Sequence, residues 1–213
     1  VVSPGTELAI LGGKESWAPL PYIPGYGSVG RVAAVGAAVS GIAVGDRVFT
    51  HGRHCARDFS ANMIVPVPAE VTAPEAACAR LAQVAFTAVR IAEAQLGDWV
   101  VVLGLGAVGN FAAQLFNLAG CEVIAADLSP GRCAQARACG IRHVLPAGPD
   151  LRERIRALTG GALARTVVDA TGAPAVTENA ITLAGPLGEL ILLGSPRGQH
   201  TANLTGFLNG SHL

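Results

Sequence analysis

The sequence predicts an α/β fold, a doubly wound parallel sheet that follows a segment rich in short strands. From residue 99 onward, short apolar runs alternate with amphipathic segments. This rhythm is typical of parallel strands joined by helices in right-handed crossovers. Before residue 86, strand-like runs with glycines and prolines at turns and ends give the segment a β-rich character instead. We therefore place a domain boundary near Phe86, between residues 1–85 and 86–213.

The first domain has β character over residues 1–59, and a long helix follows. Strand-like runs cover 25–36, 45–49 and 59–68. Glycines in the first of these runs are typical of bulges and close backbone approach. Helical periodicity begins at Pro74 and continues to Ala94, and proline suits the first turn of a helix.

The second domain alternates strands and helices. The predicted strands are 99–103, 122–126, 143–145, 166–169 and 189–194. The predicted helices are 107–118, 130–138, 151–158 and 174–184. The strands are short, apolar and often β-branched, which is typical of strands buried on both faces of a parallel sheet.

A glycine motif connects the first of these strands to its helix. Gly104 permits a tight turn, Gly106 lets the backbone approach a pyrophosphate, and Gly109 lets the helix pack closely on the strand. The helix begins at Ala107 and Val108. Its free N–H groups and positive dipole end suit phosphate groups. The motif therefore predicts a phosphate-binding turn, although an ordinary βα turn is the alternative.

An acidic residue ends the next strand. Asp127 stands 18 residues after Gly109, close to the roughly 20 residues expected for the side chain that binds the adenosine ribose. Its carboxylate would accept hydrogen bonds from the ribose hydroxyls and would repel a 2′-phosphate. The sequence therefore predicts a Rossmann domain that binds NAD in preference to NADP.

Composition excludes several other classes of function. Lys plus Arg and Asp plus Glu are equal at 15 each, so no global field favours nucleic acid or an anionic membrane. No apolar run approaches the roughly 18 residues of a membrane span, and no signal peptide is visible. The odd number of cysteines, 5, and the absence of a C-x-x-C pair predict a cytoplasmic protein without a disulfide framework.

Several segments together resemble a known family. They are Val35-Gly36, Gly45-Asp46-Arg47-Val48, Thr87-Ala88 and Val168-Asp169-Ala170-Thr171-Gly172. With the glycine motif, they resemble the medium-chain dehydrogenase/reductase superfamily, in the lineage of zinc-type alcohol dehydrogenases. Three further segments resemble its bacteriochlorophyllide dehydrogenase-like subgroup. These are Ser3-Pro4-Gly5-Thr6-Glu7, Pro24-Gly25-Tyr26 and Gly52-Arg53-His54.

The resemblance implies a GroES-like β-barrel domain with the substrate site and a Rossmann domain with the nicotinamide cofactor. Family members are longer than this chain. We therefore expect the barrel to be incomplete at the amino end and the Rossmann domain to be incomplete at the carboxyl end. Members commonly form homodimers through their last strands, which we expect to lie beyond residue 213. The edge next to the 189–194 strand is therefore expected to be exposed in this chain, and a homodimer is expected of the full-length protein.

The chain departs from the family pattern at its zinc ligands. The resemblance aligns the three catalytic ligand positions with Pro4 (or Ser3), Tyr26 and Gln83, which offer no thiolate or imidazole. The lobe that holds the structural zinc is deleted after residue 48. We therefore expect no metal. One residual ligand set is conceivable, although a polar surface loop is the preferred interpretation: His51, His54, Cys55 and Asp58.

Without zinc, another group must donate a hydrogen bond or proton to the reacting oxygen. Tyr26 is the first candidate, because it occupies the place of the metal-binding histidine; a packed tyrosine is the alternative. The resemblance gives Thr6 the role of the proton-relay hydroxyl. His54 is a third candidate, although a histidine in a loop is more often simply solvated.

Further cofactor contacts are implied by the resemblance. Arg132 lies where members keep a basic residue near the ribose, and Thr87 would face the nicotinamide side of the cleft. Thr171 belongs to the same set. The turn Leu193-Gly194-Ser195 would offer backbone groups to the carboxamide, since ligands bind at the carboxyl ends of strands in open α/β sheets.

These features favour a zinc-independent, NAD(H)-dependent oxidoreductase that transfers hydride between an alcohol and a carbonyl compound, with a small molecule as its substrate. Two alternatives stay open. One is reduction of a polarised C=C bond, as in zinc-free quinone and enoyl reductases, which commonly use NADPH. The other is a non-catalytic NAD-binding or scaffold protein.

Overall fold

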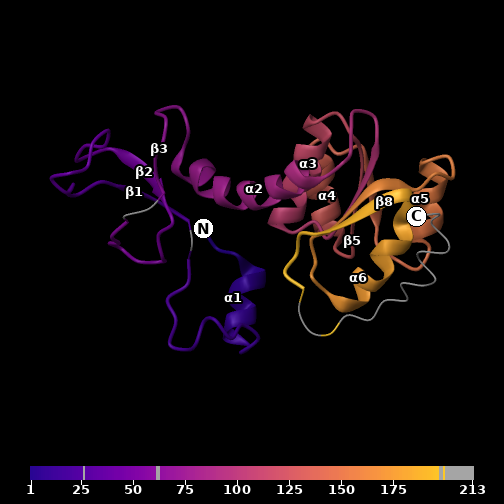
Figure 1. Ribbon diagram of the computed structural model, residues 1–213, viewed down its shortest axis with the longest axis horizontal. Coiled ribbons are helices and arrows are strands. Elements are labelled where there is room, and N and C mark those ends of the chain that lie inside the picture. Colours follow the sequence, from indigo (N-terminus) through magenta and orange to yellow (C-terminus); the bar gives the residue numbers. More distant parts are fainter. Residues whose placement is uncertain (26, 61–62, 197–198, 200–213) are drawn as a thin grey trace. The chain divides into compact units, whose positions relative to one another are not determined.

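The computed structural model describes residues 1–25, 27–60, 63–196 and 199. The chain divides into two compact units, Val1–Leu81 and Ala82–Leu213, whose elements are labelled in Figure 1. The division lies within one long helix, α2 (Ala73–Ile91). The same helix contains Phe86, where we place the domain boundary from sequence, and that boundary stays a prediction.

The first unit contains a three-stranded antiparallel sheet of order β1-β2-β3. The strands are β1 (Ser28–Arg31), β2 (Arg47–Thr50) and β3 (Ile64–Pro66). The predicted strands over 25–36 and 59–68 are therefore too long. Met63 is the reason on one side, because its φ of 50° is incompatible with a strand, so β3 begins only after it.

A helix at the amino end of this unit corrects the sequence prediction. The sequence predicts β character for residues 1–59, but α1 spans Pro4–Leu11. Ser3 is its N-cap residue and Pro4 occupies the first turn, a combination that favours a helix start. The Ser3 N–H also donates to the Glu7 carboxylate at 3.2 Å, which satisfies one donor at this helix end.

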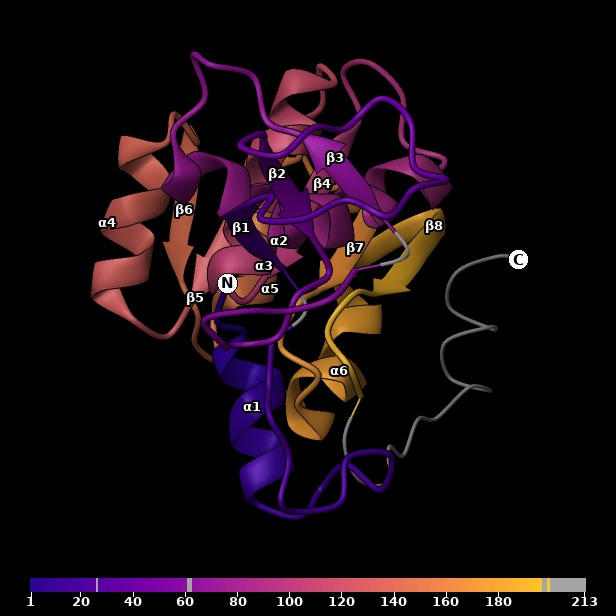
Figure 2. The same cartoon turned by 90° about the vertical axis from the view of Figure 1, so that its left-hand side faces the viewer.

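The second unit contains the predicted parallel sheet, which is confirmed. Its order is β6-β5-β4-β7-β8, and Figure 2 shows it from β6 at the left to β8 at the right. All four strand pairs are parallel. The strands are β4 (Trp99–Leu103), β5 (Glu122–Asp127), β6 (His143–Pro146), β7 (Ala164–Asp169) and β8 (Ala184–Leu192).

The helices of this unit begin where the sequence predicts, and one ends early. They are α3 (Ala107–Leu118), α4 (Pro130–Ala138), α5 (Leu151–Leu158), α6 (Pro174–Ala180) and the 3₁₀ turn η1 (Ile181–Leu183). The predicted helix over 174–184 therefore stops at Ala180. Strand β8 begins at Ala184 instead of residue 189, with a register irregularity opposite Ala164 and Thr166.

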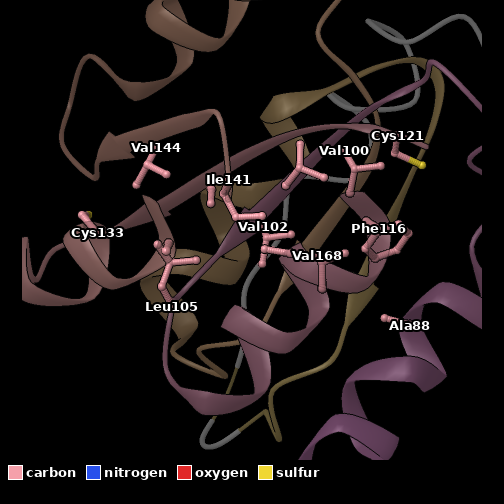
Figure 3. Packing of buried hydrophobic residues seen from close by; sticks show 14 of the residues in the cluster. Ala88, Val100, Val102, Leu105, Phe116, Cys121, Cys133, Ile141, Val144 and Val168 are labelled. Carbon is pink, nitrogen blue, oxygen red and sulfur yellow. The ribbon is translucent and has the colours of Figure 1, made fainter. Parts of the chain in front are cut away.

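Alternating side chains of the central strand enter two separate cores. Val100 and Val102 of β4 join a cluster that includes Phe116 of α3 and Ala136 of α4, and Figure 3 shows the first three of these together with Ala88 of α2. Val101 and Leu103 join the other cluster, with Ile155 of α5 and Ala180 of α6. Both faces of β4 are thus buried, as period-two alternation in a doubly wound sheet requires. No helix in the described ranges combines the length and apolarity that crossing a bilayer requires.

The cysteines give a first testable prediction. All five lie in the described ranges and are free: Cys121 and Cys133 are buried, whereas Cys55, Cys78 and Cys139 are exposed. Burial, and secondarily the charge of Asp98, raises the pKa of the Cys121 thiol, so little of it is the reactive thiolate. We expect a thiol reagent such as DTNB to modify the three exposed cysteines of the native chain quickly.

The same reagent should modify Cys121 and Cys133 only after denaturation in urea. Mass spectrometry of peptides from the modified chain assigns each site. Rapid native modification of Cys121 would contradict its burial in the core cluster that contains Phe116.

Candidate functional site

The parallel strands bring the chemically distinctive residues of the second unit to one edge of the sheet. Gly104 follows β4 directly, Asp127 ends β5, Asp169 ends β7 and Gly194 follows β8. Leu103 pairs with Ala126 on one side and with Asp169 on the other. These residues therefore lie at the carboxyl ends of neighbouring strands, which is where ligands bind in open α/β sheets.

The three glycines of the motif meet three different constraints. Gly104 has a φ of +86°, and a Cβ there would lie 2.6 Å from Cγ2 of Thr171. A Cβ at Gly109 would overlap the carbonyl oxygen of Gly104. A Cβ at Gly106 would meet no heavy atom of the described chain within 4 Å. Two of the glycines are thus required by packing, and the third faces open space.

The start of α3 presents donors to that open space. Gly106 is its N-cap residue, and no side-chain cap is formed there among the described residues. The backbone N–H groups of Ala107 and Val108, in the first helical turn, have no acceptors within an α-helix. Uncapped donors next to a residue without Cβ fit the pyrophosphate of a dinucleotide, since a phosphate oxygen can approach the backbone there.

Asp127 has two roles in the structure. Its Oδ2 accepts a hydrogen bond from the Leu105 N–H at 2.6 Å, and its Oδ1 accepts one from the Ser129 N–H at 2.7 Å. The residue is 7% exposed, and Nη1 of Arg132 lies 3.5 Å from Oδ2. Each carboxylate oxygen retains a second lone pair, so Asp127 can hold the glycine turn and still accept bonds from ribose hydroxyls.

Asp169 is a residue of this edge that the sequence analysis did not select as a site residue. It is 1% exposed. Its Oδ1 accepts bonds from the N–H of Thr171 at 2.8 Å and from its hydroxyl at 2.6 Å. Its Oδ2 accepts a bond from the Thr177 hydroxyl at 2.5 Å. Asp169 thereby fixes Thr171, whose methyl group packs against the turn at Gly104.

The predicted turn Leu193-Gly194-Ser195 packs against the same loop. The N–H groups of Leu193 and Gly194 both donate to the Asp169 carbonyl, at 2.9 and 2.8 Å. A Cβ at Gly194 would lie 2.6 Å from the Gly172 nitrogen, and one at Gly172 would overlap the Ser195 carbonyl oxygen. The loops that follow β4, β7 and β8 are therefore packed together without space for side chains between them.

The other two predicted cofactor residues are less constrained. The Arg132 side chain is 57% exposed, while its N–H donates to the Ser129 hydroxyl at 3.4 Å. Thr87 is exposed on α2, and its hydroxyl donates to the Gln83 carbonyl one turn earlier at 3.4 Å. The structure thus places Arg132 beside Asp127, and it gives Thr87 a bond within its own helix.

In the first unit, two of the three predicted catalytic residues lie near one carboxylate. The Ser3 hydroxyl donates to the Thr6 hydroxyl at 3.2 Å. Nε2 of His54 lies 3.2 Å from Oε1 of Glu7, the neighbour of Thr6. Tyr26, the third predicted catalytic residue, lies outside the described residues.

Two of the four residues that could form a residual metal site, His54 and Asp58, contact other groups instead. The carboxylate of Asp58 accepts bonds from the Arg53 N–H at 3.0 Å and from the Phe59 N–H at 2.9 Å, and these bonds lower its pKa. His54 contacts Glu7 instead of Cys55 or Asp58. In the ranges that the structure describes, no three or more His, Cys, Asp or Glu side chains are arranged to hold a metal ion.

Comparison with known proteins gives the family. A family model described as zinc-binding dehydrogenase matches residues 107–212. The D-guloside 3-dehydrogenase of Shigella flexneri is 34% identical over 164 residues, which cover 72% of this chain and 45% of that protein. An alcohol dehydrogenase of Rhizobium meliloti is 30% identical, with 84% and 62% covered. The L-galactonate-5-dehydrogenase of Escherichia coli is 27% identical, with 92% and 66% covered.

Two solved structures resemble the whole chain. A mycobacterial protein in complex with NADPH is 26% identical with a TM-score of 0.83, and the match covers 99% of this chain and 67% of that one. A zinc-dependent alcohol dehydrogenase from Streptococcus pneumoniae has a TM-score of 0.85 at 20% identity, with 96% and 69% covered, which shows a shared fold.

The parallel sheet is a Rossmann fold, with the glycine turn and acidic strand end of its dinucleotide-binding form. The chain belongs to the medium-chain dehydrogenase/reductase superfamily, as the sequence analysis predicts. The first unit corresponds to the GroES-like domain of that superfamily. The chain spans 45–66% of the length of the three curated relatives. The finer resemblance to bacteriochlorophyllide dehydrogenase-like proteins stays a prediction.

Proposed function

We propose that this chain is part of an NAD(H)-dependent oxidoreductase that transfers hydride between an alcohol and a carbonyl compound without zinc. The observation that carries the proposal is the glycine turn held by Asp127. It combines an uncapped helix start, a glycine facing open space and a carboxylate at the end of the adjacent strand. Those features fit the pyrophosphate and the ribose of one dinucleotide.

The residues of the second unit would bind and orient the cofactor. The N–H groups of Ala107 and Val108 would bind the pyrophosphate, and Asp127 would accept hydrogen bonds from the ribose. Thr171 and the Leu193-Gly194-Ser195 turn would bound the remainder of the site. When bound, the nicotinamide would supply the hydride acceptor or donor, and the chain's part is position and exclusion of water.

The first prediction from this proposal is that NADH binds more tightly than NADPH. Asp127→Ser should narrow the ratio of the two affinities by about 10- to 150-fold, because a charge-assisted hydrogen bond contributes about 1.5–3 kcal/mol. Fluorescence titration with both cofactors measures the two affinities. The affinity ratio is the informative quantity, because Asp127 also holds the Leu105 N–H, and loosening of that turn should weaken both cofactors alike.

Asp150→Ser is the matched control. Asp150 is exposed, and its ion pair with Arg154 at 3.9 Å lies on the surface of α5. The ratio of NADH to NADPH affinity should not change in this variant. NADPH binding equal to or tighter than NADH binding in the unsubstituted chain contradicts the NAD assignment.

Reduction of a polarised C=C bond with NADPH is the second candidate. Two observations favour it: the mycobacterial relative was solved with NADPH, and the exposed Arg132 guanidinium beside Asp127 could bind a 2′-phosphate. Assays with NADPH against a quinone and an enone separate it from alcohol oxidation. Binding of NADH without turnover of any substrate supports the third candidate, a non-catalytic nucleotide-binding protein.

The names of two relatives suggest a class of substrate for these assays. D-guloside 3-dehydrogenase and L-galactonate-5-dehydrogenase are named for sugar-derived compounds. We therefore include glycosides and sugar acids beside simple secondary alcohols. A homodimer of the full-length protein, joined through strands that would follow β8, is also part of the proposal, since β8 stands at one end of the described sheet order.

We further expect the purified protein to hold no stoichiometric zinc. The positions that the family resemblance assigns to the ligands are Pro4, Tyr26 and Gln83, and none offers a ligand that zinc prefers. Elemental analysis after dialysis measures the metal content. One tightly held zinc per chain contradicts this expectation, and loss of that zinc in a His51→Ala, Cys55→Ala variant would assign it to the 51–58 loop.

A further inference from the structure

A carboxylate and an imidazole from distant parts of the first unit form a pair. Oε1 of Glu7, in α1, lies 3.2 Å from Nε2 of His54, which stands 47 residues later. The side chains of His54 and Glu7 are 33% and 20% exposed. Both side chains are thus mostly covered, and part of each stays accessible to solvent.

Backbone contacts hold both partners in place. The His54 N–H donates to the Pro24 carbonyl at 2.8 Å. At Gly25, with a φ of +110°, a Cβ would lie 2.7 Å from the His54 nitrogen. Glu7 is fixed by its helix, since its N–H donates to the Ser3 carbonyl at 2.9 Å and its Oε1 accepts the Ser3 N–H at 3.2 Å.

The contact assigns different roles to the two ring nitrogens. With Nε2–H donating to the carboxylate, Nδ1 carries a lone pair. Nδ1 has no hydrogen-bond partner among the residues that the structure describes. The neighbouring Arg53 guanidinium lies 3.8 Å from the Asp58 carboxylate, whereas the His54 ring contacts the Glu7 carboxylate. An imidazole oriented in this way by a carboxylate is suited to accept a proton at its other nitrogen.

We propose that Glu7 positions His54 as the proton-carrying group of the reaction. This inference rests on the proposed alcohol oxidation. The substrate O–H bond breaks and its proton passes to Nδ1, while the electron pair of that bond becomes the second bond of the carbonyl. When bound, oxidised nicotinamide would accept the carbinol hydrogen as hydride, with its own electron pair. In the reverse direction His54 returns the proton to the carbonyl oxygen.

A purely structural role for Glu7 is the competing explanation, because the same carboxylate accepts the Ser3 N–H at the start of α1. Glu7→Gln separates the two roles. The amide oxygen still accepts the Ser3 N–H, so circular dichroism and the melting temperature should change little. The charge is lost, however, and a neutral amide can either accept from Nε2–H or donate to an unprotonated Nε2.

The first test observes His54 directly in the full chain without cofactor or substrate. Long-range ¹H–¹⁵N NMR of histidine-labelled protein distinguishes the two tautomers, and His54→Gln assigns the signal. We expect one tautomer, Nε2–H, in the unsubstituted chain and a mixture in Glu7→Gln. His51→Gln is the control and should leave the His54 signal unchanged. A mixture in the unsubstituted chain, or no change in Glu7→Gln, overturns the positioning role.

The second test measures NAD⁺-dependent oxidation of the alcohol that turns over fastest in a panel of secondary alcohols, glycosides and sugar acids. His54→Gln, whose amide can keep the bond to Glu7, should lower kcat by roughly 10²- to 10⁴-fold and leave the KM for NAD⁺ unchanged. Glu7→Gln alone should lower kcat relative to the unsubstituted chain. Added to His54→Gln, it should lower kcat no further. An equal effect of Glu7→Gln in both backgrounds supports the structural role and contradicts the proposal.

The two tests distinguish failure of this inference from failure of the proposed function. If NADH binds but no alcohol is oxidised, the proposed reaction fails, and the proton transfer at His54 fails with it. The NMR result is independent of turnover and decides alone whether Glu7 positions the ring. Turnover that His54→Gln leaves unchanged contradicts only the role of His54.

Discussion

Replacing Asp169 with alanine is expected to lower the free energy of unfolding of the second unit by about 3–5 kcal/mol. The carboxylate is 1% exposed and accepts three hydrogen bonds, two from Thr171 and one from Thr177. Hydrogen bonds to a charged group contribute about 1.5–3 kcal/mol each, and unpaired buried donors carry a further cost. NADH affinity should fall as well, because Thr171 packs against the turn at Gly104.

Urea denaturation followed by Trp99 fluorescence measures this loss, since Trp99 lies at the start of β4. A Trp17→Phe background removes the other tryptophan. Thr177→Val is the graded comparison, because it deletes one of the three bonds and should cost about 1–3 kcal/mol. If Asp169→Ala costs no more than Thr177→Val, the carboxylate is not the centre of this loop.

The sequence predicts the second unit well because its elements depend on local patterns. The starts of α3, α4 and α5 follow from strand ends, glycines and prolines close by in sequence. Strand β4 is predicted with its observed bounds, 99–103, since an apolar run of that length between a turn and a glycine motif has few other interpretations. Local signals agree with the tertiary structure here, as minimally frustrated sequences require.

The elements of the first unit are harder to predict from sequence, because its strands are short and its irregular segments are long. The sequence analysis predicts β character where α1 lies, although Ser3 and Pro4 are good signals for a helix start. The limits of β3 depend on the positive φ of Met63, which no local pattern indicates for a residue with a side chain.

In the site, the sequence identified residue types and the structure identified their partners. The roles of Gly104, Gly106 and Gly109 follow from a motif with fixed spacing. The bond from Leu105 to Asp127 joins residues 22 positions apart, and the contact of Glu7 with His54 spans 47. Such pairs depend on how strands and loops are arranged in space, so a single sequence gives no sign of them.

Replacing Gly109 with alanine is expected to cost at least about 3 kcal/mol of unfolding free energy, at the upper end of the range for overpacked sites, and to abolish NADH binding. The added Cβ overlaps the carbonyl oxygen of Gly104, a backbone atom that cannot rotate away. Relief requires the turn to move, and Gly104 with it. Without this clash, alanine should stabilise the helix by about 1 kcal/mol relative to glycine, so a rise in stability would contradict the observed packing.

Gly106→Ala is the matched substitution, and its two effects should separate. A Cβ there meets no heavy atom of the described chain within 4 Å, and φ is −63°, so the cost in stability should stay below about 1 kcal/mol, the effect of a poorer N-cap residue. The methyl group would project into the open space beside the first turn of α3, where we propose that the pyrophosphate binds. NADH affinity should therefore fall by at least about tenfold, corresponding to about 1.4 kcal/mol, while the stability measured by urea denaturation is retained. If NADH binds Gly106→Ala as tightly as the unsubstituted chain, the pyrophosphate does not approach the backbone at this turn, and the proposed cofactor site is wrong.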